Sequence, residues 1–251
     1  MYKVTNFIDG KECTESNESI NIINPSYGTQ IGEVIYATKD SADKAIEAAA
    51  KTFKTWSKTG LSYRAELMMK FRQGIINRSE EIIDICVSEA GKTRPDAEAE
   101  LDRAIQALTH TAGVQHFYPS IMSPNVAGGI DITDVRYPIG VIAGCGPFNF
   151  PILIPILHAS MAIVTGNTFI AKPSEKVPSI SRLYADIFKE SGFPDGCYSV
   201  LNGGKDIVEQ LVCHEKVAGL AFIGSTPVAK SLKMLGVQNN TKVQALGGGK
   251  N

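Results

Sequence analysis

Apolar residues in the first part of the chain recur at helical spacing. Between Ser41 and Trp56 they fall on one stripe, which consists of Ala42, Ala45, Ile46, Ala49, Phe53 and Trp56. A second helix is predicted from about Ser62 to Asn77. The third begins at Ser79, whose hydroxyl can cap the free amides, and it ends at Gly91. The fourth has Pro95 in its first turn, where a missing amide costs least. The first part of the chain is therefore predicted to be mostly helical.

The pattern changes in PSIMSPNVAGGIDITDVRYP, where polar residues separate the apolar ones and Gly128-Gly129 offers a tight turn. This pattern predicts an extended β-hairpin arm. Because such an arm has two exposed edges and little to pack against, we expect it to bind a strand of another domain or subunit.

From Ile139 onward, short β-rich runs alternate with helical ones. The predicted strands are IGVIAG, TFIAKP, YSVLNG, GLAFIG and KVQAL, each separated from the next by one candidate helix. Strict alternation implies right-handed crossovers and an open parallel sheet, which is an α/β fold. Three parts are therefore expected: a helical part at 1–118, the arm at 119–138 and a Rossmann-like part at 139–251.

Ligands of open parallel sheets bind beyond the carboxyl ends of the strands. Four segments should therefore border one crevice, namely GCGPFNFP, KPSE, NGG and GST. The sequence contains no GxGxxG, so this is not the usual dinucleotide fingerprint.

Composition narrows the candidate functions. The chain has 251 residues with 25 basic and 26 acidic side chains and a formal net charge of −1. Charge therefore gives no reason to expect nucleic acid or an anionic membrane as a partner, and small molecules are favoured.

The longest apolar run, residues 150–164, contains two prolines and is shorter than the ~20 residues of a membrane-spanning helix. The N-terminus shows no export signal, so we expect a cytoplasmic protein.

The cysteines and histidines argue against several classes of enzyme. The five cysteines are widely spaced without a CxxC pair, and the four histidines show no metal-ligand spacing. We therefore expect reduced thiols and no metal site. GxSxG and the P-loop pattern are also missing, which excludes the common serine hydrolases and P-loop NTPases.

Two segments that end predicted strands carry groups suited to a nucleotide. In FIGSTPVAK, Gly224 lets a phosphate approach the free amides at a helix start, and Ser225 adds a hydroxyl donor. In AKPSE, Lys172 and Glu175 lie near the same edge. An acid there can accept both ribose hydroxyls and repels a 2′-phosphate, which favours NAD over NADP. Taken singly, the patterns also fit an ordinary capped helix and two solvated charges beside a proline turn.

Asn149 stands between two phenylalanines in GPFNFP, just before an apolar helix. An amide in such surroundings needs a hydrogen-bonding partner. It can serve as the side-chain donor of an oxyanion hole. The alternative role is the N-cap of the helix that follows.

GPFNFP, GNTFIAKPSE, FIGST and LGGGKN, in this order after four helices and an arm, resemble the aldehyde dehydrogenase superfamily. The similarity runs from about Phe7 to the last residue. It implies a Rossmann-like NAD-binding domain, a separate catalytic domain and a β-arm used in oligomerisation. It also implies that Asn149 is the oxyanion amide. The coenzyme-binding residues that it implies are Lys172 and Glu175 for the adenosine ribose and Gly224 and Ser225 for the pyrophosphate, together with Phe148 and Gly203.

The ending departs from the usual motif of this family, ELGGKS, in which the glutamate activates water to hydrolyse a cysteine thioester. Depending on the alignment, Ala245 or Leu246 takes that place, and no Asp or Glu follows Glu215. A basic surface is the simpler interpretation of this tail. Without a general base, however, a thioester survives until a thiol arrives. The departure resembles the CoA-acylating branch of the family, which oxidises malonate and methylmalonate semialdehydes with NAD and passes the acyl group to CoA.

Members of that branch hold the substrate carboxylate with an arginine on the helix before the arm. GKTRPDAEAELDRAIQ matches that segment, and Arg103 falls on the position. Because Arg103 lies off the apolar stripe of its helix, a solvated arginine is the alternative.

The nucleophilic cysteine of the family lies well beyond the glycine motif, and Cys145 does not occupy its position, so we expect Cys145 to be a small core residue. The resemblance therefore implies a fragment that carries the coenzyme half and is inactive alone. Three functions stay open. They are the NAD-binding portion of a homo-oligomeric, CoA-acylating semialdehyde dehydrogenase, a stand-alone nucleotide-binding or partner-binding module, and a hydrolytic aldehyde dehydrogenase whose base comes from elsewhere.

Overall fold

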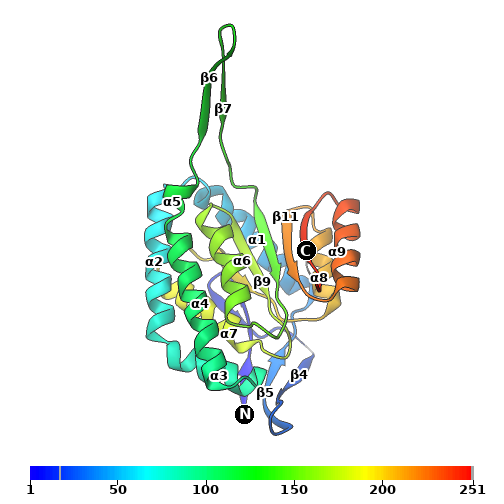
Figure 1. The fold of residues 1–251 in the computed structure, drawn as a ribbon. Helices are drawn as coiled ribbons and strands as arrows, with labels where there is room; N and C mark the ends of the chain where they lie inside the picture. The colour runs from blue at the N-terminus through cyan, green and yellow to red at the C-terminus, as the bar shows by residue number, and fades with distance from the viewer. Residues whose placement is uncertain (17, 250–251) are drawn as a thin grey trace.

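A seven-stranded sheet with helices on both faces forms the centre of the molecule (Figure 1). The structure is a computed structural model that describes residues 1–16 and 18–249. The helices are α1 (Lys39–Trp56), α2 (Leu61–Asn77), α3 (Ser79–Ala90), α4 (Arg94–Ala112), α5 (Val114–Phe117), α6 (Leu153–Val164), α7 (Ser179–Glu190), α8 (Lys205–Cys213) and α9 (Thr226–Gln238).

The C-terminal part forms the parallel section of this sheet. Its strands are β8 (Val141–Cys145), β9 (Thr168–Lys172), β10 (Tyr198–Val200), β11 (Val217–Ile223) and β12 (Lys242–Leu246). They lie in the order β12-β11-β8-β9-β10 and all their pairings are parallel, with one helix between successive strands along the chain. The five predicted strands and the α/β fold class are confirmed.

Side chains along β9 alternate between the two faces of the sheet. Phe169 and Ala171 pack into the apolar core beneath α6 and α7, with α2, α3 and α4 behind them, whereas Ile170 packs against α1 and α8 on the opposite face. This two-residue period fixes the register of the strand, because a shift by one residue would exchange the faces. All three side chains are buried, and each of the two large ones contributes roughly 1.5–3 kcal/mol of burial free energy.

The helices begin and end close to the predicted positions, with one local correction. Gly91 ends α3 in the left-handed conformation at φ 67°, and Pro95 lies in the first turn of α4. Ser79 does not cap α3, because Arg78 holds the N-cap position. The Ser79 hydroxyl instead donates to the carbonyl oxygen of Ile76 at 2.6 Å and so satisfies the end of the preceding helix, α2.

The N-terminal part is less helical than expected, because the described residues before α1 include five strands. They are β1 (Tyr2–Val4), β2 (Asn6–Ile8), β3 (Lys11–Cys13), β4 (Ser19–Asn24) and β5 (Thr29–Ile35). Strand β2 extends the central sheet by pairing antiparallel with β10, and β3 pairs antiparallel with β2 at the edge, while β1, β5 and β4 form a separate sheet. Asp9 and Gly10 join β2 to β3 with φ values of 49° and 73°, as a type I′ hairpin turn requires. That Asp-Gly pair is the sequence signal for the hairpin.

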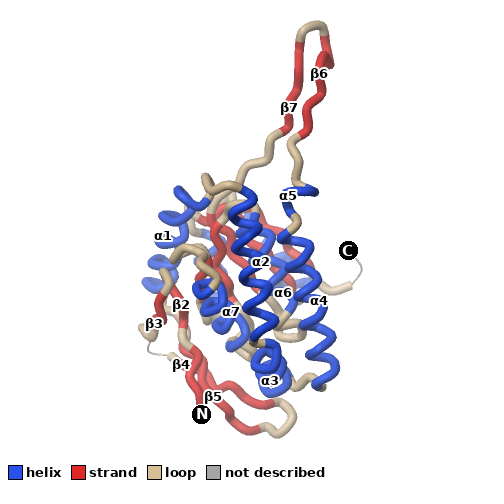
Figure 2. Tube along the Cα trace, turned by 90° about the vertical axis from the view of Figure 1, so that its left-hand side faces the viewer, coloured by secondary structure: helices blue, strands red, loops and turns tan. Residues whose placement is uncertain are grey.

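The predicted arm is a β-hairpin that projects from the body of the molecule (Figures 1 and 2). Strands β6 (Ile121–Ala127) and β7 (Ile130–Asp134) pair antiparallel around the Gly128-Gly129 turn, and every residue of both strands is exposed. The hairpin is confirmed, and its apolar side chains are exposed in the part of the chain that the structure describes.

Candidate functional site

A cavity of about 560 Å³ lies at the carboxyl end of the parallel strands. Its walls come from the ends of β8, β9 and β11 and from the first turns of α8 and α9, with Tyr36 at one side. A cavity of this size is in the range that binds cofactors. The lining residues used below are Tyr36, Lys172, Glu175, Gly204, Phe222 and Val228.

Lys172 and Glu175 lie on opposite ends of the short turn that follows β9. The Nζ atom of Lys172 is 3.7 Å from an Oε atom of Glu175, and the side chains are 11% and 41% exposed. Burial, and secondarily the charge of Glu175, raises the pKa of Tyr36 to about 12, so its phenol stays protonated and can donate a hydrogen bond. Together they offer a cation, a carboxylate and a hydroxyl to one ligand.

The start of α9 provides a possible anion site at the rim of the same cavity. Ser225 is its N-cap residue and is exposed, and the Ser225 side chain makes no capping hydrogen bond to the amides of the first turn. Gly224 cannot be replaced without rearrangement, because a Cβ atom there would lie 2.4 Å from the ring of Phe222. The helix start and Ser225 are therefore accessible to an anion.

The structure separates two of the predicted coenzyme residues from this cavity. Gly203 is buried, and the cavity wall is formed by the next residue, Gly204. A Cβ atom on Gly203 would lie 2.5 Å from Ile207, so its small size serves the packing of α8. Phe148 does not line the cavity and points into a neighbouring one.

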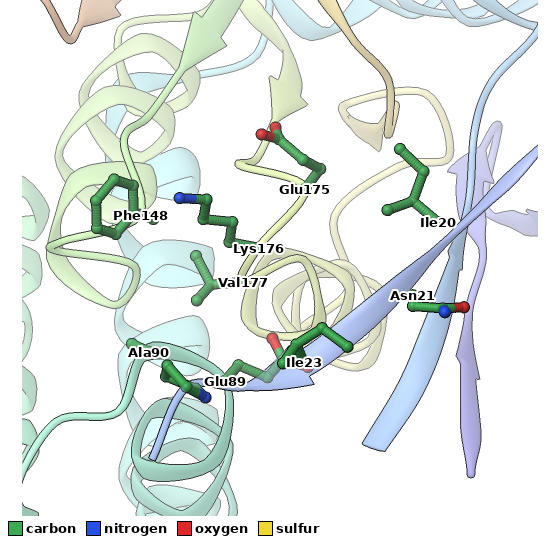
Figure 3. A pocket seen from close by; sticks show the side chains of 10 residues that line it. Ile20, Asn21, Ile23, Glu89, Ala90, Phe148, Glu175, Lys176 and Val177 are labelled. Atoms are coloured by element: carbon green, nitrogen blue, oxygen red, sulfur yellow. The ribbon is translucent and has the colours of Figure 1, made fainter. Parts of the chain in front are cut away.

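That second cavity, of about 450 Å³, lies between β4, the end of α3 and the segment after β9 (Figure 3). The Lys176 ammonium group is 4.6 Å from the centre of the Phe148 ring. Glu175 borders both cavities. Phe148 lines the second cavity and Lys172 lines the first, so the segment that carries Glu175 separates the two residues.

Asn149 is exposed on the segment that joins β8 to α6, and its side chain forms no hydrogen bond with any described residue. It is not the N-cap of α6, because that helix begins at Leu153 with Ile152 at the N-cap. The local alternative is therefore wrong. An amide that is exposed and has no partner within the described chain is free to donate to a bound molecule.

The start of α6 is held instead by Glu100 of α4, a residue that the sequence analysis did not single out. One oxygen of Glu100 accepts hydrogen bonds from the amides of Ile152 and Leu153 at 2.8 and 2.9 Å. The other lies 2.5 Å from the Nζ of Lys92, and the Glu100 side chain is only 1% exposed. The sequence shows only that Glu100 precedes Arg103 by three residues, because the amides that Glu100 binds are about fifty positions away.

Arg103 is exposed on α4, one turn beyond Glu100, and the only hydrogen bond of its side chain within the described residues is a long one of 3.4 Å to Gln106. Residues three apart on a helix are surface neighbours. Because Glu100 contacts the segment that follows Asn149, this spacing puts Arg103 on the side of α4 near that segment. A guanidinium in this place can bind a carboxylate.

The predicted position of the general base lies on the edge strand β12. Ala245 and Leu246 pair with Phe222 and Ile223 of β11, and neither side chain is an acid. Lys250 and Asn251, which end the glycine motif, lie outside the described residues.

Cys145 has the properties of a core residue. It is 4% exposed at the end of β8, and burial raises the pKa of its thiol to about 11. Because the thiolate is the nucleophilic form, the thiol is unreactive at neutral pH.

Within residues 1–16 and 18–249, no group of three or more His, Cys, Asp or Glu side chains is arranged to hold a metal ion. None of the helices in the same part of the chain has the length and apolar character needed to cross a membrane.

Comparison with known proteins identifies similar chains. The model of the aldehyde dehydrogenase family matches residues 13–251. A malonate-semialdehyde dehydrogenase of Bacillus pumilus is 37% identical over 98% of this chain, and the aligned part covers 51% of that protein. The chain thus spans about half the length of the curated relatives it matches.

Solved structures show the same fold. The methylmalonate-semialdehyde dehydrogenase of Oceanimonas doudoroffii superposes with a TM-score of 0.96 at 37% identity, over all of this chain and 51% of the other. A Sinorhizobium meliloti structure solved as a complex with NAD gives a TM-score of 0.95 at 35% identity, over all of this chain and 51% of the other. The fold class predicted from the sequence motifs is confirmed by both.

Proposed function

This chain belongs to the aldehyde dehydrogenase family, and from that premise we propose that it supplies the coenzyme-binding half of an NAD-dependent semialdehyde dehydrogenase. The proposed substrates are malonate or methylmalonate semialdehyde, and the proposed acyl acceptor is CoA. The similarity to proteins named for those semialdehydes supports the substrate class. The observation that carries the proposal is the cavity at the carboxyl ends of the parallel strands, with Lys172 and Glu175 on its wall.

In the proposal the cavity binds the adenosine part of NAD. In the proposal the Glu175 carboxylate accepts the two ribose hydroxyls and Lys172 donates to the same ribose. A 2′-phosphate would meet the negative charge of Glu175, so NAD is preferred over NADP. The uncapped start of α9, with Gly224 and Ser225, receives the pyrophosphate. When bound, NAD supplies the acceptor for a hydride.

The aldehyde is proposed to lie between α4 and the segment that carries Asn149. The Asn149 amide donates to the aldehyde oxygen as negative charge develops on it, which is the function of an oxyanion hole. The free amide of Asn149 supports this role. Arg103 binds the carboxylate at the other end of the semialdehyde, and its exposure and spacing from Glu100 support that assignment.

The absence of an acid at Ala245 and Leu246 supports CoA as the acyl acceptor. Without a general base, water is a poor nucleophile toward a thioester, whereas the thiol of CoA is a good one. A hydrolytic enzyme would need a base from another part of the protein.

The test measures NADH formation from malonate and methylmalonate semialdehyde with and without CoA. It compares the 251-residue chain with a chimera in which the chain is followed by the second half of the Bacillus pumilus relative. We expect no turnover by the chain alone and CoA-dependent turnover by the chimera. CoA-independent turnover of equal rate would contradict the acylating assignment, and turnover by the chain alone would mean that one of its own cysteines is the nucleophile.

A further inference from the structure

We propose that Glu100 is a positioning residue that holds the Asn149 segment against α4 and thereby fixes the oxyanion amide relative to Arg103. The inference rests on the proposed function, because it assigns a purpose to Glu100 in the reaction of Asn149. Its structural part, the control of the segment by Glu100, can be tested without any turnover.

Glu100 connects two helices, α4 and α6. Its carboxylate lies on α4 and accepts from the amides of Ile152 and Leu153, which begin α6. These amides would otherwise have no partner, because no side chain of the segment itself caps α6. The N-terminal end of a helix carries partial positive charge, so an anion binds there more strongly than a neutral acceptor.

Glu100 is buried, and its negative charge is paired with a lysine. Its side chain is 1% exposed, and Lys92 at 2.5 Å is the counter-ion. The same Lys92 ammonium group lies 4.3 Å from the centre of the Phe150 ring, so Lys92 links Glu100 to the residue beside Asn149. The Tyr184 hydroxyl donates to the carbonyl oxygen of Ile152 at 3.0 Å, which gives the start of α6 a second buried contact.

The two residues that flank Asn149 each contact a lysine. Phe150 lies against Lys92, and Phe148 lies against Lys176 on the other side. Both rings are more than a third exposed, so each of these contacts is weak, whereas the Glu100 hydrogen bonds are buried and charged. Glu100 is therefore the principal anchor of the segment.

The anchor has a chemical consequence because an oxyanion donor acts only at the correct distance. Displacing a catalytic group by about 1 Å can reduce the rate about a hundredfold. Because Arg103 follows Glu100 by one turn of α4, Glu100 also sets the separation between the carboxylate end and the aldehyde end of the substrate. The loss of Glu100 should therefore affect the chemical step more than coenzyme binding.

The first experiment follows amide hydrogen exchange in the 251-residue chain. Glu100→Gln keeps the shape of the side chain and removes its charge, and Glu100→Asp keeps the charge and withdraws the carboxylate by one methylene. The matched control is Glu89→Gln, since Glu89 is another buried glutamate that accepts the first amide of a helix, from Ser179 of α7. We expect exchange at Ile152 and Leu153 to become at least about tenfold faster in both Glu100 variants and to stay unchanged in the control. Unchanged exchange in the Glu100 variants would overturn the proposal.

The second experiment measures kinetics in the chimera with malonate semialdehyde and with propionaldehyde, which has no carboxylate. We expect Glu100→Gln to lower kcat for both aldehydes about tenfold to hundredfold, with the NAD dissociation constant within about twofold of the parent value. Glu89→Gln should leave kcat unchanged. Faster exchange without any loss of kcat would make Glu100 merely structural and overturn the assignment. A parent chimera that oxidises neither aldehyde contradicts the proposed function, and the exchange result then decides the role of Glu100 in the segment independently.

Discussion

Glu175 is the residue on which the choice of coenzyme depends in the proposed site. Replacing it with glutamine keeps the size of the side chain but removes the charged acceptor that the two ribose hydroxyls need. Since a hydrogen bond to a charged group contributes about 1.5–3 kcal/mol, we expect Glu175→Gln to weaken NAD binding about tenfold to hundredfold. The preference for NAD over NADP should decrease as well. Calorimetry on the 251-residue chain measures both effects.

The control is Glu215→Gln, which removes the same charge from an exposed position outside the cavity. Its affinity for NAD should equal that of the parent. If the two variants bind NAD equally well, the ribose does not contact Glu175.

Asn149 should contribute to the chemical step and not to coenzyme binding. Removing one oxyanion donor typically lowers kcat about 10²–10³-fold. We expect Asn149→Ala to produce a loss of that size in the chimera, while calorimetry on the 251-residue chain gives the same NAD affinity as the parent. A variant that retains its kcat would show that the amide does not meet the aldehyde oxygen.

Sequence patterns can show which residues lie together when those residues are neighbours along the chain. Lys172 and Glu175 share one cavity because they are only three positions apart, in the single turn after β9. Glu100 could not be found in the same way, because its partners, the amides of Ile152 and Leu153, are about fifty positions away. The position of Phe148 depends equally on distant residues, because it lies beside Lys176 and lines a cavity together with residues of β4.

At the scale of elements, helix α6 contains His158, and we expect this histidine to make the free energy of unfolding depend on pH. Burial lowers the pKa of His158 to about 4 from its ordinary value of 6.5. Between these values the unfolded chain binds a proton that the folded chain does not. The free energy of unfolding should therefore fall as the pH drops from about 6.5 to about 4, by roughly 1–3 kcal/mol.

Thermal unfolding of His158→Gln tests this dependence. The variant should lose less stability than the parent over that interval, whereas His116→Gln, a change at an exposed histidine, should retain the parent slope. Parallel curves for all three proteins would mean that His158 is protonated in the folded state.

The hairpin of β6 and β7 carries the predicted contact between subunits. Ile130 and Ile132 are each more than half exposed on β7. We expect Ile130→Ser and Ile132→Ser together to shift the chimera toward monomer in sedimentation equilibrium while its circular dichroism spectrum stays the same. If the parent chimera sediments as a monomer at all concentrations, or if the double variant assembles equally well, the arm does not join subunits.

Helices and parallel strands were predictable because apolar periodicity and local caps specify them. The stripe from Ala42 to Trp56 became α1, and the Gly128-Gly129 pair became the turn of the arm. The N-terminal strands were not predicted, although Asp9-Gly10 marks one of their turns. Strand β2 is only three residues long and is stabilised by pairing with β10, nearly two hundred positions away, which no short segment of sequence encodes.

At the scale of the whole molecule, the coenzyme cavity and the Asn149 segment lie at one edge of the sheet, and the family relatives are about twice as long as this chain. In the proposed function the chain provides contacts to the adenosine and pyrophosphate, and the nicotinamide faces the other half of the enzyme. Binding energy should therefore reside in the ADP-ribose portion of the coenzyme, and affinity for the 251-residue chain should be modest.

The most direct test of this account is calorimetric titration of the 251-residue chain with NAD, ADP-ribose and NADP. The account predicts that NAD and ADP-ribose bind equally well within about twofold, with dissociation constants on the order of 0.1–1 mM, and that NADP binds more weakly. A dissociation constant for NAD of about 1 μM or lower would show that the chain binds the whole coenzyme. Equal binding of NADP, or no binding of ADP-ribose, would contradict the assignment of Lys172 and Glu175 to the adenosine ribose.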